Sequence, residues 1–247
     1  MGEVIAVLSG KGGTGKTTLC AGIATALAIS GKRVLCIDCD VGLRNLDIAL
    51  GLTELGSISF LDVCQERYPL TRATVHPVYP GLHFLTAPVG CQSDSIDRFA
   101  FARMLEQARS RFQYIFLDAP AGIEAGFHLA ARAADRVILV AGPDPASIRD
   151  ASQSAGVLEQ LGKTDVRLVV NRLRKKTFRA INLTIDDVMD NVGLPLLGVV
   201  PEDENVILAA AFGQPLLGYS SKGASAACHR IARRLQGLRV KIKECLL

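Results

Sequence analysis

The sequence predicts an α/β protein whose doubly wound, mostly parallel sheet is covered by helices on both faces. Short apolar runs alternate with helical patterns, and most runs are continuous rather than alternating, as in strands buried on both faces. The runs are 4–8, 33–38, 82–86, 114–118, 136–140, 166–170 and 196–200. The first leads directly into a glycine-rich loop and a helical pattern, as in a P-loop fold. No linker, repeat or low-complexity segment divides the chain, so we expect one domain over residues 1–247.

The composition is compatible with a single α/β domain and argues against several other classes of protein. Of the 247 residues, 49% are hydrophobic, which is enough for a substantial core. Trp is absent and aromatic residues make up 5%, which argues against a stacking platform for single-stranded nucleic acid. No apolar run reaches membrane-spanning length and the chain opens on a strand, so we expect a cytoplasmic protein without signal peptide or transmembrane helix. The seven scattered cysteines favour reduced thiols over a disulfide framework.

The loop at residues 10–18 has the composition and the context of a phosphate-binding P loop. Its glycines let the backbone curl around phosphate oxygens, and the following helix N-terminus adds positive potential. We expect Lys16 to reach the β and γ phosphates of ATP and the Thr17 hydroxyl to bind Mg²⁺. The nucleotide-binding residues predicted here are Gly10, Lys11, Gly12, Gly13, Thr14, Gly15, Lys16, Thr17 and Thr18.

Two aspartates follow at the end of the next predicted strand. Asp38 and Asp40 are two residues apart and would share one side of an extended strand. Ligand sites of open α/β sheets lie beyond the carboxyl ends of the strands, so both carboxylates are well placed. We expect Asp40 to orient the attacking water and Asp38 to lie near Mg²⁺ and its waters. The alternative is that one of them caps the short helix that follows.

Polar residues also end two later strands. Asp118 follows four apolar residues, the form of a Walker B strand, and is expected to hold Mg²⁺ directly or through water. The alternative is an aspartate that only ends the strand. Asn171 ends the run 166–170, where its amide could both donate to and accept from an adenine edge. The predicted metal ligands are therefore Thr17, Asp38 and Asp118.

Other polar features carry weaker predictions. His76 and His83 are isolated in the segment 51–90 and have no visible partners for a metal site. A basic loop follows Asn171, and for it a solvated surface is favoured over an anion-binding one. Its residues are Arg172, Arg174, Lys175, Lys176 and Arg179.

The P loop resembles the deviant Walker A motif of the ParA/MinD ATPase family, through the residues Lys11-Gly12-Gly13-Thr14-Gly15-Lys16-Thr17. Further segments are similar to the family's switch I (40–47), switch II (119–124), adenine-binding Asn-Arg pair (171–172) and Pro-Glu-Asp motif near the base (198–205). The resemblance implies that Asn171, Arg172, Pro201 and Asp203 bind nucleotide; Asp203 could also cap the next helix. It also implies that Lys11 reaches across an ATP-bound homodimer to the partner's phosphates.

The resemblance implies a Mg²⁺-dependent, dimerising ATPase whose slow hydrolysis a partner accelerates. In the MinD branch of the family the ATP-bound dimer sits on the membrane, positions the division septum through MinC, and is released by MinE or organised by another topological factor. One alternative is a DNA-partitioning ParA-type ATPase that rides on nonspecific DNA through basic patches. Another is an iron–sulfur carrier, for which Cys228 and Cys245 are too far apart in sequence to form a C-x-x-C.

The C-terminal residues 230–247 are predicted to form a basic amphipathic helix. Apolar residues recur there at spacings of three and four, at Leu235, Leu238, Ile242 and Cys245. Arg234, Arg239, Lys241 and Lys243 lie largely off that stripe. Such a helix is typical of a membrane-surface element, so we expect it to bind an anionic membrane on the inner face of the cell when ATP is bound. The alternative is an ordinary final helix packed on the sheet, for which 224–235 is a candidate.

Overall fold

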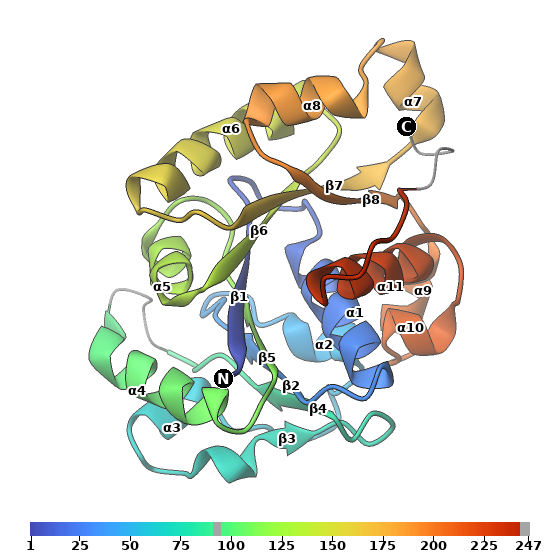
Figure 1. Ribbon diagram of the computed structural model, residues 1–247. Coiled ribbons are helices and arrows are strands. Elements are labelled where there is room, and N and C mark those ends of the chain that lie inside the picture. The colour runs from blue at the N-terminus through green and yellow to red at the C-terminus, as the bar shows by residue number, and fades with distance from the viewer. Residues whose placement is uncertain (91–94, 243–247) are drawn as a thin grey trace.

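The computed structural model describes residues 1–90 and 95–242, and these build an eight-stranded sheet (Figure 1). The strand order is β3-β4-β2-β5-β1-β6-β7-β8. Within this sheet β3 and β4 pair antiparallel, whereas the other neighbours are parallel. The strands are β1 (Glu3–Leu8), β2 (Val34–Asp38), β3 (Thr74–Val75), β4 (Leu82–Leu85), β5 (Tyr114–Asp118), β6 (Arg136–Ala141), β7 (Val166–Leu173) and β8 (Leu196–Pro201).

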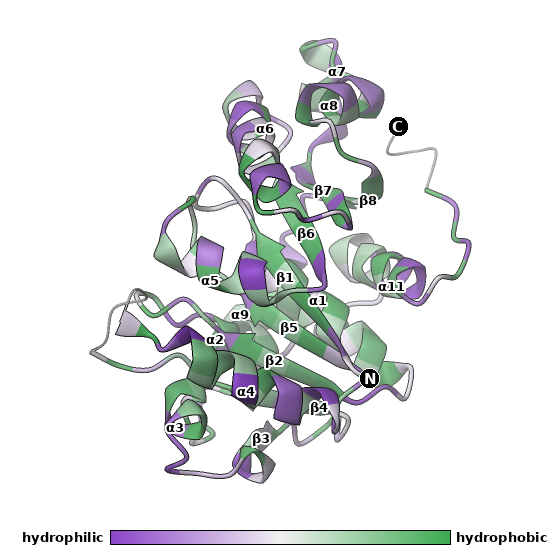
Figure 2. Cartoon of the chain, turned by 60° about the vertical axis from the view of Figure 1, so that its left-hand side comes forward, coloured by the Kyte–Doolittle hydropathy of each residue, from purple (hydrophilic) through white to green (hydrophobic). Residues whose placement is uncertain are grey.

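Helices cover both faces of the sheet and bury two separate apolar layers. One layer lies under α1, α2, α10 and α11 and includes Leu19 and Ile231; the other lies under α3 to α8 and includes Phe60 and Phe127. Figure 2 shows the hydrophobic strands between these helices. The helices are α1 (Lys16–Ile29), α2 (Leu46–Leu50), α3 (Phe60–Cys64), α4 (Arg98–Arg109), α5 (Ala125–Ala133), α6 (Pro145–Gln160), α7 (Lys175–Ala180), α8 (Ile185–Val192), α9 (Asn205–Ala211), α10 (Leu216–Tyr219) and α11 (Gly223–Leu235).

The predicted doubly wound α/β fold is confirmed, and all seven predicted runs are strands. Asp97 and Asp144 cap α4 and α6, each by accepting a hydrogen bond from a backbone N–H of the first turn. Because the strands are mostly parallel, the carboxyl ends of β1, β2, β5, β7 and β8 meet at one edge of the sheet. No helix among the residues described is long and apolar enough to cross a membrane.

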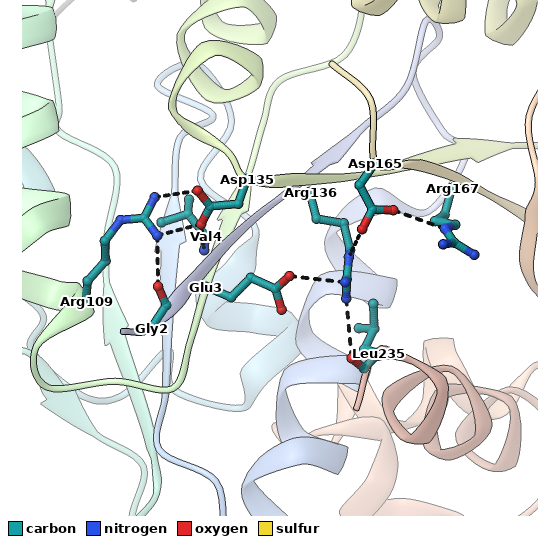
Figure 3. A network of polar contacts seen from close by, with 9 residues as sticks. All are labelled: Gly2, Glu3, Val4, Arg109, Asp135, Arg136, Asp165, Arg167 and Leu235. Atoms are coloured by element: carbon teal, nitrogen blue, oxygen red, sulfur yellow. Dashed lines mark hydrogen bonds and ion pairs between the residues drawn. The ribbon is translucent and has the colours of Figure 1, made fainter. Parts of the chain in front are cut away.

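The opposite edge of the sheet is held by ion pairs (Figure 3). Arg136, at the start of β6, pairs with Glu3 and Asp165. Its Nη1 also donates to the carbonyl oxygen of Leu235, 3.3 Å away, where α11 ends. Arg109, at the end of α4, contributes a second ion pair at this edge. The hydrogen bond from Arg136 to Leu235 fixes the end of α11 to the body of the protein.

The predicted helix over residues 230–247 is wrong for residues 236–242. Helix α11 ends at Leu235, and the backbone of residues 236–242 is not helical. Gly237 has a φ of 78°, the left-handed conformation that commonly terminates a helix. The alternative is confirmed for residues 224–235, because α11 packs on β8 and α1. Lys243 and Cys245, parts of the predicted basic face and stripe, lie outside the described residues.

Candidate functional site

The P loop connects β1, in the middle of the sheet, to the first turn of α1. Gly13 and Gly15 have φ angles of 78° and 87°, which favour glycine. A Cβ on Gly15 would overlap the Asn171 amide nitrogen, so only glycine fits between α1 and β7. Gly12 and Gly13 are exposed at the mouth of the site, where backbone N–H groups are accessible. The local sequence therefore folds into a phosphate cradle at the carboxyl edge of the sheet.

Lys16 lies at the base of this loop, where its side chain is buried. Its Nζ donates to Ser9 Oγ at 2.9 Å, and Ser9 Oγ in turn donates to the Lys11 carbonyl oxygen at 2.6 Å. Burial lowers the Lys16 pKa, while the carboxylates of Asp118 and Asp40 act in the opposite direction. Ser9 thus fixes both the ammonium group and the turn, a role that the sequence analysis missed.

Asp38 and Asp118 lie side by side because β2 and β5 are neighbours and pair at these two residues. Both side chains are buried. Burial raises the pKa of Asp38 to about 6, and the nearby Asp40 adds to the rise. Burial raises the pKa of Asp118 to about 8, with repulsion from Asp38 as the next cause. Two carboxyls in this position disfavour negative charge until a cation neutralises it.

Asp118 also has an unused oxygen. The Thr17 side chain hydrogen-bonds to Asp118, yet Asp118 Oδ1 is buried without a partner. A buried carboxylate oxygen without a donor is costly, and it suits a divalent cation that takes oxygen ligands. Thr17 and Asp118 therefore fit the predicted Mg²⁺ site. The structure brings them together from α1 and β5.

Asp38 and Asp40 also order the loop that leads into α2. Asp38 accepts hydrogen bonds from Asp40 N at 2.9 Å and from Leu46 N at 3.2 Å, the first residue of α2. Asp40 Oδ1 accepts from Gly42 N and Leu43 N at 3.2 and 3.3 Å. The alternative that one of the pair caps the short helix is therefore confirmed for Asp38. Its carboxyl also lies beside that of Asp118, so the capping bond is compatible with a position near the predicted metal site.

A cleft of about 370 Å³ opens beside the P loop, between β6, β7 and β8. Asn171 Nδ2 donates to the Thr14 carbonyl oxygen at 2.7 Å, and Arg172 Nη1 donates to the Gly13 carbonyl oxygen at 3.0 Å. Both predicted base-site residues thus contact the P loop directly. The cleft is lined by Lys11, Gly12, Gly13, Thr14, Gly142, Pro143, Asp144, Ser147, Arg172 and Glu202.

The predicted residues Pro201 and Asp203 flank this cleft but do not line it; Glu202 between them does. Asp203 accepts from Asn205 N at 3.0 Å, which confirms that it caps α9. Its other oxygen accepts from Ala224 N at 2.8 Å, at the start of α11. Asp203 therefore joins two helices behind the cleft. Asp203 Oδ1 also accepts from the Asn205 side-chain amide at 2.7 Å, so both carboxylate oxygens already have donors within the chain.

Lys11 extends over the mouth of the cleft. Its side chain is about half exposed, and its Nζ lies 3.9 Å from Asp144 Oδ1. Lys11 therefore stays free to move toward another negative group, since an exposed pair at this distance is weak. The sequence analysis missed Asp144, Ser147 and Glu202 as cleft residues. Only Asp144 has a local signal, because an aspartate before proline is a common helix start.

The other candidate ligands do not form a site. Cys20, Cys36, Cys39, Cys64 and Cys228 are free and buried. No group of three or more His, Cys, Asp or Glu side chains in residues 1–90 and 95–242 could hold a metal ion. The described part of the chain thus gives no support to an iron–sulfur carrier.

Comparison with known proteins agrees with the geometry. The family model for the CobQ/CobB/MinD/ParA nucleotide binding domain matches residues 5–216. The septum site-determining protein MinD of Synechocystis is 38% identical over 240 residues, covering 96% of this chain and 90% of its own length. MinD of Bacillus subtilis is 38% identical over 248 residues, covering 98% and 92%.

Solved structures give the same result. A chain of the MinC:MinD cell division protein complex of Aquifex aeolicus superposes with a TM-score of 0.90 at 36% identity, covering 98% of each chain. MinD of Pyrococcus horikoshii, solved with Mg-ADP, gives 0.84 at 26% identity and covers 98% of this chain and all of its own. The likeness therefore extends over nearly the whole chain.

Proposed function

The chain belongs to the CobQ/CobB/MinD/ParA nucleotide-binding family, and from this we propose that it is a MinD-type ATPase that binds ATP with Mg²⁺ and hydrolyses it. The observation that carries the proposal is the placement of Lys16 and Thr17 in a P loop beside the buried carboxyls of Asp38 and Asp118. A phosphate cradle and an oxygen-rich cation site on adjacent strands suit phosphoryl transfer, which depends on positioning and charge neutralisation.

Each residue has a role in this proposal. The P-loop backbone and Lys16 hold the β and γ phosphates, and Lys16 leaves Ser9 to do so. Thr17 and Asp118 would hold Mg²⁺, and Asp38 would lie near the waters of the ion. The ion, when bound, neutralises charge on the phosphates. Asp40, at the mouth of the site, orients the attacking water.

The proposal extends to assembly and to cell division. We propose that ATP binding produces a homodimer in which Lys11 contacts the partner's phosphates, supported by its exposed position on the cleft. Relatives with 38% identity are named for septum site determination, and a structural neighbour was solved with MinC. We therefore propose that the dimer binds a MinC-type division inhibitor and an anionic membrane surface. A MinE-like topological factor would accelerate hydrolysis.

Replacing Asp40 with Ala tests this function. ATP affinity should stay within about threefold of the parent, because Lys16 and the P loop are intact. Hydrolysis should fall at least about 100-fold if Asp40 orients the water. Binding is measured by calorimetry and turnover by phosphate release, with Asp190→Asn, an exposed residue of α8, as the control. Unchanged turnover of the Asp40 variant would contradict the assigned role.

A second candidate function is the ParA-type use of DNA. Lys175, Lys176 and Arg179 on α7 form no ion pair with described residues, so a small basic surface is available beside the cleft. An ATP-dependent and salt-sensitive shift of duplex DNA, without binding to anionic vesicles, would favour this function.

A further inference from the structure

The segment after α11 folds back on the body instead of leaving it. Gly237 N donates to the Arg234 carbonyl oxygen at 2.9 Å and Leu238 N to that of Arg233 at 3.1 Å, which closes a tight turn. In Figure 1 the last dark red segment crosses α11 and runs toward β8. The end of α11 itself is held in place, because Arg136 Nη1 donates to the carbonyl oxygen of Leu235 (Figure 3).

Arg234 is the main anchor of the returning segment. Its Nε and Nη2 both donate to the Val240 carbonyl oxygen, at 2.9 and 2.6 Å. Its Nη1 donates to the Leu197 carbonyl oxygen at 2.5 Å. One guanidinium group therefore joins α11, the edge strand β8 and the tail. A lysine ammonium could not make this planar set of contacts.

Ile242 is the second anchor. It lines a narrow slot together with residues of β8 and α11, and it packs against the apolar core layer that includes Val199 of β8. Leu238, four residues earlier, remains 48% exposed. In a helix these two side chains would lie on one face, since residues four apart are neighbours. In the docked segment they are separated, so they cannot enter a membrane together.

We propose that residues 238–242 form a strap, docked through Arg234 and Ile242, which withholds the tail from an anionic lipid surface until it is released. The inference rests on the proposed membrane association and adds its regulation. A membrane helix would have to start after Gly237, because α11 is fixed at Leu235 and Gly237 has a left-handed backbone.

Positive charge supplies the means of release. Arg239 and Lys241 on the strap are exposed and form no ion pair with described residues. Arg230 lines the same slot and, after burial, is the next cause that lowers the Arg234 pKa. Crowded cations weaken the docked state, while an anionic surface attracts each exposed basic residue. Lipid therefore competes directly with the slot for Ile242.

Thiol labelling tests the strap without membranes. Ile242→Cys and Leu238→Cys are made separately in the full chain with Cys91→Ser and Cys245→Ser, since the other five cysteines are buried. We expect the thiol at 242 to react at least about fivefold more slowly than that at 238. Arg234→Lys should raise the rate at 242 about tenfold, the equivalent of losing one interaction of about 1.4 kcal/mol. Arg233→Lys, on an exposed neighbour with the same charge, should leave it unchanged.

Equal rates at 242 and 238 in the parent, or an unchanged rate at 242 in Arg234→Lys, would overturn the strap. If Arg234→Lys does not fold, Gly237→Ala replaces it, because a left-handed φ disfavours alanine and the turn would open. Here too, an unchanged rate at 242 would overturn the proposal.

Sedimentation with phosphatidylglycerol–phosphatidylcholine vesicles tests the consequence. With ADP, Arg234→Lys in the native cysteine background should sediment several-fold more than the parent, while Arg233→Lys should match it. If the parent sediments with ATP but Arg234→Lys shows no gain with ADP, the strap's regulatory role is overturned, whereas the membrane association stands. Absence of sedimentation by every variant, even with ATP, would overturn the membrane association itself and the regulation that depends on it.

Discussion

Replacing Asp118 with Asn should stabilise the protein in the absence of Mg²⁺ while abolishing its cation site. The pKa of Asp118 rises from the ordinary 3.8 to about 8 in the folded protein because the carboxyl is buried beside Asp38. The folded state therefore holds this proton more tightly than the unfolded state. Its contribution favours folding at low pH and is lost as the pH rises from 3.8 toward 8.

The size of the effect follows from this shift. Between pH 3.8 and pH 7 the folded protein keeps a proton that the unfolded chain has released. The free energy of unfolding falls by about 1.4 kcal/mol per pH unit over about three units, so the loss at pH 7 is at most about 4 kcal/mol. We expect about 2 kcal/mol in practice, because proteins relax around buried charge. Asn retains an oxygen for the Thr17 hydroxyl and carries no charge. The melting temperature should rise by about 4–8 °C for a chain of this size.

Thermal unfolding at pH 7 without Mg²⁺ measures this change, with the exposed Asp190→Asn as the matched control. The advantage of the Asp118 variant should shrink by up to about 1.4 kcal/mol for each unit by which the pH is lowered toward 4. With Mg²⁺ and ATP the order should reverse, since a bound ligand stabilises only the protein that binds it. A variant that is less stable than the parent at pH 7, or whose advantage is independent of pH, would refute the reasoning.

Two further predictions concern assembly and the rear of the site. Lys11→Ala should bind ATP within about threefold of the parent but remain monomeric with it, because Lys11 forms only a weak, exposed ion pair in the single chain; normal ATP-dependent dimers in light scattering would exclude a role in the partner's site. Asp203→Ala should lower the free energy of unfolding by about 1–3 kcal/mol, because it leaves the N–H groups of Asn205 and Ala224 without their acceptor; a denaturant midpoint equal to the parent's would contradict this.

Local signals explain why the sequence alone predicts most of the fold and the phosphate site. Most strands of the sheet are continuous apolar runs. Asp38 and Asp118 end their strands, and Asn171 lies near the end of β7, so the three residues mark the carboxyl edge. The P loop is one uninterrupted segment, so the spacing of its glycines and lysines along the sequence is enough to predict its conformation. These features need no knowledge of what packs against them.

The missed features depend on contacts between distant parts of the chain. Glu202 reaches the cleft only because β8 lies beside β7, and the bond from Asn171 to Thr14 spans 157 positions. The tail shows the same limit, because its apolar spacing fits a helix while Arg234 holds Val240 in another conformation. Arg233 and Arg234 in the last turn, followed three residues later by Gly237, are a helix-end signal that could have corrected the boundary.

The same contacts indicate how the empty and loaded states of the site must differ. Lys16 is bonded to Ser9, Asn171 to Thr14 and Arg172 to Gly13, so donors that would face a nucleotide already have partners within the chain. Nucleotide binding would then replace these hydrogen bonds with bonds to the ligand. The loop would need little rearrangement, because each donor already bonds to a residue of the P loop or next to it. The carboxyl pair behaves differently, since Asp118 Oδ1 has no partner to exchange. The donors of Lys16, Asn171 and Arg172 are therefore satisfied without ligand. The carboxyl pair, in contrast, is held at a cost in stability that a divalent cation would remove.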